Sequence, residues 1–213
     1  DAILKENPDE VHEGGANLRK QLENMQIHGV SPVVAINVFP GDHDGDIKAI
    51  EEIAEEYGAR VATTTHFSEG GKGAAPLAEA ITEAAEEPSE FKVLYPDEMP
   101  LREKVQTIAQ KIYGADGVEF STQANKQIDT YEANGFGNLP ICIAKTHLSI
   151  SSNASLKGAP TGWTLPVREV RASVGAGFVY PICGDMRTMP GLGANPAAAS
   201  IDIDESGEIV GLS

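Results

Sequence analysis

Apolar and polar residues alternate along the first two thirds of the chain in a way that predicts helices and strands in turn. Residues 15–28 space apolar side chains at helical intervals, and the run 32–39 after them is continuously apolar and rich in β-branched residues. Such a run is typical of a strand buried on both faces of a parallel sheet. Because the alternation repeats, the sequence predicts a three-layer α/β fold with a parallel sheet.

The remaining elements follow the same pattern, with glycine or proline near many of their ends. The spacing predicts helices at residues 41–58, 75–87, 99–113 and 122–134. It predicts strands at residues 60–66, 91–95, 118–120 and 140–145. Ser121 stands before the last of these helices, where its hydroxyl is expected to cap the helix.

The pattern changes after residue 150, where helical periodicity disappears. Strands are predicted at residues 164–174 and 177–184, and a hairpin at residues 201–212. We therefore divide the chain into an α/β portion, residues 1–150, and a loop-rich β tail of the same unit, residues 151–213.

Composition and charge narrow the classes of function. The chain has 213 residues, of which 41% are hydrophobic, enough for one large domain or two small ones. Its formal net charge is −16, because 32 acidic residues face 16 basic ones. A surface of this charge repels phosphate backbones, which disfavours nucleic-acid binding. The charge otherwise indicates solubility, and an anionic substrate would need a local gathering of Lys and Arg.

The cellular compartment of the protein can be inferred from its two cysteines and from the lack of long apolar runs. Cys142 and Cys183 lie in short apolar segments, so we expect buried free thiols, and neither has the CxxC partner typical of zinc sites. No run approaches the roughly 18–20 apolar residues that span a bilayer, and no signal peptide is visible. The sequence predicts a cytoplasmic protein without membrane contact. Asp1 in place of Met suggests a fragment or a processed product.

Two phenylalanines stand at the ends of predicted strands, each in a loop that leads into a helix. Phe39 ends the strand at 32–39, and Phe67 follows the strand at 60–66. Ligands of open α/β sheets bind beyond the carboxyl ends of the strands, where two rings could hold a flat heterocycle between their faces. The alternative is that both rings pack beneath their loops as minor core, and the residues alone favour it.

A glycine-rich loop follows Phe67. Gly70 and Gly71 offer backbone amides to an anion, and Lys72 adds positive charge before a helix. Such loops are also common for purely steric reasons. The loop is not a Walker A motif, because Gly73 stands where Ser or Thr is required and His66 where the first glycine is required, and no other segment matches the motif.

An acidic cluster precedes the helix predicted at 41–58. Its members are Asp42, His43, Asp44 and Asp46. They could hold a metal ion, but helix capping explains them better, since carboxylates are stabilised by the free amides and the positive end of the helix dipole. We therefore expect no metal.

Several basic or histidine side chains have no assigned role. They are Lys145, His147, Arg168, Arg171 and Arg187. They could line an anion site or pair with structural carboxylates, and the sequence favours neither. The chain contains no GxSxG, no HExxH and no Ser-His-Asp arrangement, so no catalytic residue is assigned.

Five blocks of the sequence resemble the formate–tetrahydrofolate ligase family. They are VVAINVFPGD, THFSEGGKGA, PICIAKTHLSIS, PVREVRASVGAGFVYPICGDMRTMPGLG and PAAASIDIDESGEIVGL. The resemblance covers essentially the whole chain and is to the C-terminal portion of the family. It implies an enzyme that uses ATP and magnesium to join formate to tetrahydrofolate, giving 10-formyltetrahydrofolate through formyl phosphate.

The resemblance also implies a folate site and a missing ATP site. It places folate binding at Phe39, Pro40, Phe67, Gly70, Gly71 and Lys72. Phe39 and Phe67 match the aromatic pair that stacks on the folate ring system, although many members carry Trp at the second position. Family members are longer, are usually homotetramers, and have their P-loop upstream of anything present here.

Three hypotheses stay open. In the first, the chain supplies half of the folate pocket and is inactive without the P-loop segment. In the second, it is a non-catalytic folate-binding or assembly subunit that pairs with a separate P-loop chain, and an exposed apolar face on the first helices would support this. In the third, it keeps the fold and binds nothing.

Overall fold

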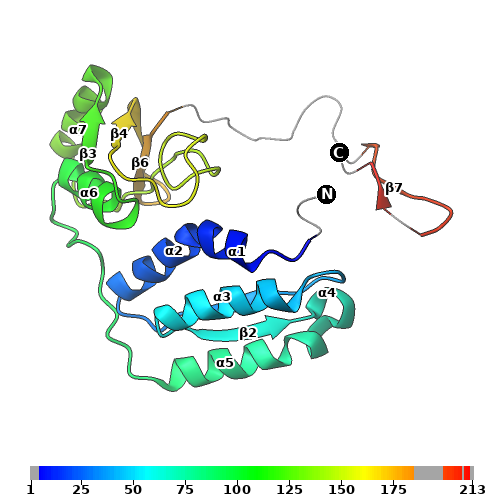
Figure 1. Cartoon of the computed structure of the whole chain (residues 1–213). Helices are drawn as coiled ribbons and strands as arrows, with labels where there is room; N and C mark the ends of the chain where they lie inside the picture. The colour runs from blue at the N-terminus through cyan, green and yellow to red at the C-terminus, as the bar shows by residue number, and fades with distance from the viewer. Residues whose placement is uncertain (1–4, 185–198, 208, 212–213) are drawn as a thin grey trace.

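A computed structural model of the chain describes residues 5–184, 199–207 and 209–211 (Figure 1). Helices and strands alternate as the hydrophobic pattern predicts, which confirms the α/β class. Each sheet among the described residues contains two strands. The complete three-layer sheet therefore stays a prediction.

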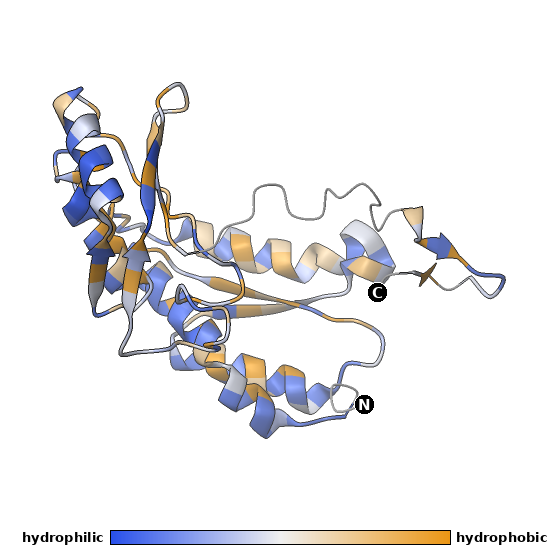
Figure 2. Ribbon diagram, turned by 90° about the horizontal axis from the view of Figure 1, so that it is seen from above, coloured by the Kyte–Doolittle hydropathy of each residue, from blue (hydrophilic) through white to orange (hydrophobic). Residues whose placement is uncertain are grey.

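The first part of the chain places helices on both sides of a parallel strand pair. β1 (Val33–Asn37) pairs in parallel with β2 (Arg60–Thr64), and α3 (Asp44–Glu56) connects them. In Figure 1, α3 and α5 (Ala75–Glu86) lie on opposite sides of this pair. Figure 2 shows hydrophobic positions running along the strands and striping the helices beside them. These elements form a βαβ unit, which a parallel connection requires.

Two helices precede β1. α2 (Ala16–Ile27) confirms the helix predicted at residues 15–28, and α1 (Pro8–Gly14) was not predicted. The sequence nevertheless contains signals for the start of α1. The Asn7 side chain accepts a hydrogen bond from the Glu10 amide at 3.3 Å, and Pro8 lies in the first turn. Both are ordinary helix-start signals.

The second part of the chain combines two helical segments with two strand pairs. Its elements are α6 (Leu101–Thr107), η2 (Ile108–Ile112), β3 (Gly117–Phe120), α7 (Thr122–Ala133), β4 (Thr164–Val167), β5 (Glu169–Ser173) and β6 (Phe178–Ile182). β3 pairs in parallel with β4, and β5 pairs antiparallel with β6. Ser121 caps α7 as predicted, by accepting a hydrogen bond from the Ala124 amide at 3.0 Å. The division at residue 150 stays a prediction, and β3 and β4 pair across it.

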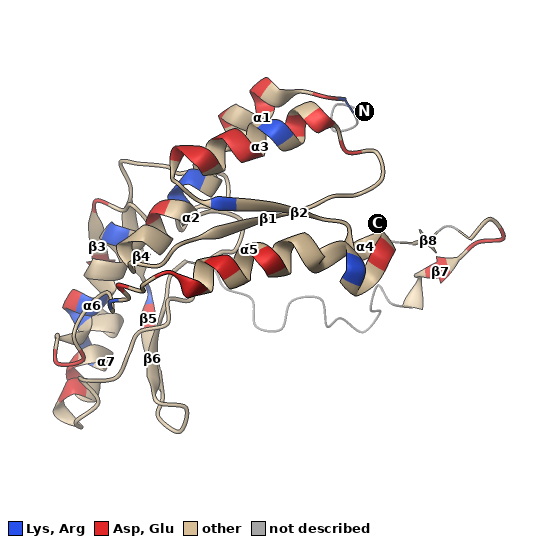
Figure 3. Cartoon of the chain, turned by 90° about the horizontal axis from the view of Figure 1, so that it is seen from below, with Lys and Arg blue, Asp and Glu red and all other residues tan. Residues whose placement is uncertain are grey.

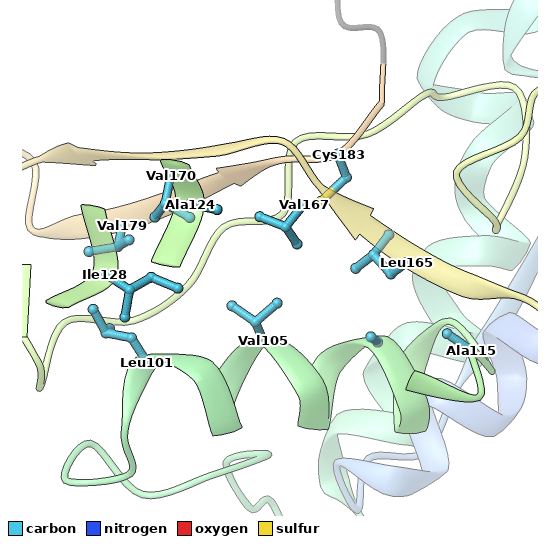
Figure 4. Packing of buried hydrophobic residues seen from close by; sticks show 11 residues of the cluster. Leu101, Val105, Ala115, Ala124, Ile128, Leu165, Val167, Val170, Val179 and Cys183 are labelled. Atoms are coloured by element: carbon cyan, nitrogen blue, oxygen red, sulfur yellow. The ribbon is translucent and has the colours of Figure 1, made fainter. Parts of the chain in front are cut away.

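The larger hydrophobic core lies between α6, α7 and these strands. Figure 4 shows Leu101 and Val105 on α6 facing Ile128, Val167 and Val170. Each of these five side chains is at most 1% exposed. Full burial of a large apolar side chain contributes about 1.5–3 kcal/mol, so this cluster is a main source of stability for the second part.

One predicted strand is wrong, and another is reduced to isolated bridges. Residues 91–95 pair with no strand in the described part of the chain, and Phe91 and Val93 are 63% and 67% exposed. Residues 140–145 make two isolated parallel bridges to β6, Ile141 to Val179 and Ala144 to Ile182. The Cys142 and Ala144 amides donate to the carbonyls of Val179 and Pro181, each at 2.9 Å. The apolar pattern of residues 91–95 reflects the tendency of this segment to be buried, but no strand among the described residues covers it.

The expectation that β1 is buried on both faces is also wrong. Ile36 is buried, but Ala35 and Asn37 are exposed. No third strand among the described residues lies beside β1, so part of one face stays open.

The C-terminal hairpin is confirmed. β7 (Asp202–Ile203) pairs antiparallel with β8 (Ile209–Val210). Arg187 lies outside the described residues. No α-helix is assigned after α7 in the described residues, and none of the described helices combines the length and apolarity that crossing a bilayer requires.

The acidic side chains are spread over the molecule. Figure 3 shows Asp and Glu on α1, α3, α5 and α7 and on the turn after β7, with fewer Lys and Arg between them. Such a spread keeps like charges apart and favours solubility.

The two cysteines occupy different environments. Cys183 is buried as expected, but Cys142 is exposed, and both are free. Burial raises the pKa of the Cys183 thiol from its ordinary 9.0 to about 12. Because the folded-state pKa lies above the unfolded value, the stability that this thiol contributes is present below pH 9 and is lost as pH rises toward 12.

The difference in exposure between the two thiols predicts a two-step reaction with a thiol reagent such as DTNB at pH 8. Cys142 should react at once, because its thiol is exposed. Cys183 should react only when the chain unfolds. Replacing Cys142 with Ser should remove the fast step alone. Two fast thiols in the folded protein would contradict the burial of Cys183.

Candidate functional site

Phe39 and Phe67 meet at the carboxyl edge of the β1–β2 pair. Asn37 at the end of β1 and Thr64 at the end of β2 are register partners, so the chain leaves both strands at the same edge. The centroids of the two phenylalanine rings lie 5.0 Å apart, with the ring planes inclined by 54°. The structure therefore brings together the pair that the strand ends indicated.

Both rings are exposed. Phe39 keeps 43% and Phe67 keeps 67% of its surface accessible, so the alternative that they pack beneath their loops as core is wrong. The rings touch each other, and a third ring between them would need about 3.5 Å on each side. A flat ligand would therefore stack on an outer face of the pair or displace one ring. Phe67 lies on α4 (His66–Glu69), a single helical turn.

Asp42 fixes the turn that carries Phe39. Its carboxylate Oδ2 accepts a hydrogen bond from the Phe39 amide at 2.8 Å, and its own amide donates to the Phe39 carbonyl at 3.1 Å. Pro40 and Gly41 lie inside this turn, and Gly41 adopts a φ of 100° that favours glycine. Asp42 therefore belongs to the aromatic loop.

The rest of the acidic cluster lies at the start of α3. The amide of Gly45 donates to Oε1 of Glu6 at 2.8 Å, and the carboxylate of Asp46 accepts from the Asn7 amide at 2.8 Å. Carboxylates do accept hydrogen bonds from amides here, as predicted. The carboxylate that accepts from an amide of α3 is that of Glu6, which is distant in sequence and cannot be found from a local pattern. Within the described residues, no three His, Cys, Asp or Glu side chains are grouped to hold a metal ion.

The glycine-rich loop is the 3-10 helix η1 (Gly70–Ala74), and its geometry depends on Gly73. The Thr65 amide donates to the Gly73 carbonyl at 3.0 Å, and Gly73 is buried. A Cβ at position 73 would lie 2.6 Å from the Thr65 carbonyl carbon, whereas one at Gly71 would meet nothing within 4 Å. Glycine is therefore required at position 73 for steric reasons. Lys72 is exposed on the same turn.

Two threonine side chains just before α4 hold this helix in place. The Thr64 hydroxyl lies 2.9 Å from Nδ1 of His66, and the Thr65 hydroxyl donates to Oε2 of Glu69 at 2.5 Å. Sequence reasoning missed Thr65 and Glu69, because a loop was expected here; their spacing of four residues is the signal that could have found them. These contacts hold the turn on which Phe67 stands.

Comparison with known proteins identifies the family. A family model described as formate–tetrahydrofolate ligase matches residues 1–213. The chain belongs to the formate–tetrahydrofolate ligase family. This confirms the resemblance carried by the five sequence blocks.

Curated members of the ligase family match nearly the whole chain. The formate–tetrahydrofolate ligase of Saccharopolyspora erythraea is 65% identical over 211 residues, covering 99% of this chain and 37% of that protein. Formate–tetrahydrofolate ligase 3 of Rubrobacter xylanophilus is 58% identical over 219 residues, covering 99% of this chain and 38% of that protein. The chain thus spans less than two fifths of the length of these ligases.

Lys145, one of the basic residues without an assigned role, bonds to the backbone of the loop that follows it. Its ammonium donates to the backbone carbonyls of Thr146 and Ser151, each at 3.1 Å, and to that of Ser149. It also lies 4.9 Å from the centroid of the Tyr113 ring. Burial lowers the pKa of the ammonium. Lys145 therefore orders the loop that follows it.

The other basic candidates lie apart from the phenylalanine pair in the chain. Arg168 and Arg171 place their Nη2 atoms 3.5 Å and 3.0 Å from Oε1 of Glu169, so each pairs with a carboxylate, one of the two alternatives left open by the sequence. His147 is exposed.

The close approach at Gly73 predicts an asymmetric pair of glycine variants. Gly73→Ala should lower the free energy of unfolding by about 1–3 kcal/mol, because the new methyl group meets backbone that has to move. Gly71→Ala, the matched control, should leave the thermal midpoint nearly unchanged. Thermal unfolding followed by circular dichroism measures both. Equal midpoints for the two variants would contradict the packing described here.

Proposed function

We propose that this chain supplies the folate-stacking surface of an ATP-dependent ligase, which joins formate to tetrahydrofolate through formyl phosphate and yields 10-formyltetrahydrofolate. One observation carries the proposal: two exposed aromatic rings meet at the carboxyl ends of adjacent parallel strands in a chain of this family. That edge is where open α/β sheets bind ligands, and aromatic faces stack well on flat heterocycles.

In this proposal, the rings and the residues around them bind different parts of the folate. Phe39 and Phe67 stack on the bicyclic ring of folate, with Pro40 beside the first ring. Lys72 and the amides of Gly70 and Gly71 attract an anionic part of the ligand. Lys72 is exposed on the turn that follows Phe67 and provides local positive charge that an otherwise acidic chain needs.

ATP chemistry belongs to the rest of the ligase in this proposal. Phosphoryl transfer depends on preorganised positive charge around the phosphates. The sequence has no P-loop, and the described residues offer no group of carboxylates for magnesium. We therefore propose that ATP and magnesium are held mostly by residues of the ligase outside this chain. We propose that the chain alone does not turn over, and that the complete enzyme is cytoplasmic and homotetrameric.

A second candidate is a folate-binding or assembly subunit that pairs with a separate P-loop chain. Exposed apolar side chains near the end of α2 favour it, with Met25 at 44% and Phe91 at 63% exposure. Both candidates share the folate surface and differ in how the ATP half is supplied.

Titration of the purified chain with tetrahydrofolate by calorimetry tests the folate surface. Phe39→Ala and Phe67→Ala should each weaken binding by about 1–3 kcal/mol, the usual range for loss of a stacking ring. Phe67→Trp should strengthen it, because indole offers a larger face and an N–H donor. Phe91→Ala is the matched control, since Phe91 is 63% exposed, close to the 67% of Phe67, but lies near the opposite end of β1.

The Phe67→Trp variant also places a fluorophore in the site. Trp163 packs against the core of the second part of the chain, so quenching on folate addition should come from position 67 alone. Binding that survives both alanine changes, or no binding by a folded chain, would overturn the proposed stacking surface.

A further inference from the structure

The backbone that carries Phe67 is held less firmly than the backbone that carries Phe39. The turn of Phe39 directly follows β1 and is closed by two hydrogen bonds with Asp42. Phe67 lies on α4, a single turn of four residues in which no side chain is buried. Such a short helix is not stable by itself, because forming the first turn costs more conformational entropy than its few hydrogen bonds offset. The position of the Phe67 ring therefore depends on contacts made by the residues around it.

The C-terminal end of α4 lacks close packing. Gly70 ends the helix with a φ of 60° and a ψ of −143°, a combination that essentially only glycine adopts. A Cβ at Gly70 or at Gly71 would meet no atom within 4 Å. Close packing begins again at Gly73, where a Cβ would lie 2.6 Å from the Thr65 carbonyl carbon. Two glycines in open space thus connect α4 to the packed part of the loop.

Thr65 joins the contacts that hold α4 in its place. Its carbonyl accepts hydrogen bonds from the amides of Ser68 and Glu69, each at 3.0 Å, and its own amide donates to the Gly73 carbonyl. Its hydroxyl donates to Oε2 of Glu69 at 2.5 Å. A hydrogen bond to an ionised acceptor is roughly twice as strong as a neutral one. The Thr65–Glu69 contact is therefore the side-chain contact that we expect to contribute most to closing this turn.

We propose that Glu69 is a positioning residue for folate: through Thr65 it keeps α4 closed and thereby holds the Phe67 ring against Phe39. The inference rests on the proposed function, since it concerns the same aromatic surface. Folate then stacks on an outer face of a pair that is already in place, so less conformational freedom is lost on binding. Without the carboxylate, the turn populates open arrangements, and the apparent affinity falls in proportion to the fraction of molecules that stay closed.

Two substitutions at position 69 separate the hydrogen bond from the charge. Glu69→Ala removes both, whereas Glu69→Gln removes the charge and keeps an oxygen that can accept from the Thr65 hydroxyl. In a calorimetric titration of the full chain with tetrahydrofolate, Glu69→Ala should raise the Kd about three- to tenfold, the factor that corresponds to one hydrogen bond. Glu69→Gln should leave the Kd nearly unchanged.

The partner residue and a distant carboxylate complete the set of variants. Thr65→Val should weaken binding as much as Glu69→Ala, and the double variant no more than either alone, because both changes remove the same contact. Glu79→Ala, at an exposed glutamate on α5, is the matched control for loss of one negative charge and should leave the Kd unchanged. Far-UV circular dichroism checks that each variant remains folded.

A second readout follows the two rings without any ligand. In the NMR spectrum of a chain with isotope-labelled phenylalanine, the Phe39 and Phe67 rings should share a nuclear Overhauser cross-peak, because their centroids lie 5.0 Å apart. Phe67→Ala identifies this cross-peak by removing it. The cross-peak should weaken or disappear in Glu69→Ala and persist in Glu69→Gln. An unmodified chain that shows the cross-peak but binds no tetrahydrofolate would count against the proposed function, and the variants would still decide whether Glu69 positions Phe67.

Three results would overturn the inference. One is a ring cross-peak of undiminished strength in Glu69→Ala. The second is a Kd that Glu69→Ala leaves unchanged or lowers although the cross-peak is lost, since folate would then bind separated rings as well or better. The third is an equal rise of the Kd in Glu69→Ala and Glu69→Gln, which would assign the effect to the charge.

Discussion

The parallel register of β1 and β2 is the constraint on which the candidate site depends. Asn37 pairs with Thr64, and the Val38 amide extends the pairing by donating to the Thr64 carbonyl at 2.9 Å. Phe39 and Phe67 meet because both follow these positions closely. A register shift of one residue would turn each side chain of the shifted strand to the other face. The two rings lie beyond the strands, on a turn and on α4, but the hydrogen-bonded pairing of β1 with β2 brings them together.

Much of this arrangement could be predicted from the sequence, because it is encoded locally. Helical spacing located α2, α3, α5 and α7 within a few residues, and Ser121 marked the start of α7 by a side chain next to its own partner. The position of the aromatic pair also followed from local rules, since each ring stands at the end of an apolar run. Parallel strands place such ends together without further information.

Contacts between distant residues could not be predicted in this way. Glu6 meets the first turn of α3 across 39 positions, and Lys145 orders its loop through carbonyls that have no sequence signal. Burial was misjudged where a segment has no partner among the described residues, as at residues 91–95 and on one face of β1. Hydrophobic periodicity reports the tendency of a segment to be covered. The covering element has to be present before that tendency becomes structure.

The contact between the two phenylalanine rings has a consequence for ligand affinity. Each ring already occupies part of the other's stacking surface, so a flat ligand that enters between the rings competes with their contact. Aromatic pairs are worth about 0.5–1.5 kcal/mol beyond their buried area. A ligand that inserts between the rings has to offset that amount first, and its observed affinity is the difference between two stacking energies. A neighbouring element that held Phe67 away from Phe39 would therefore act as an activator of the site without touching the ligand.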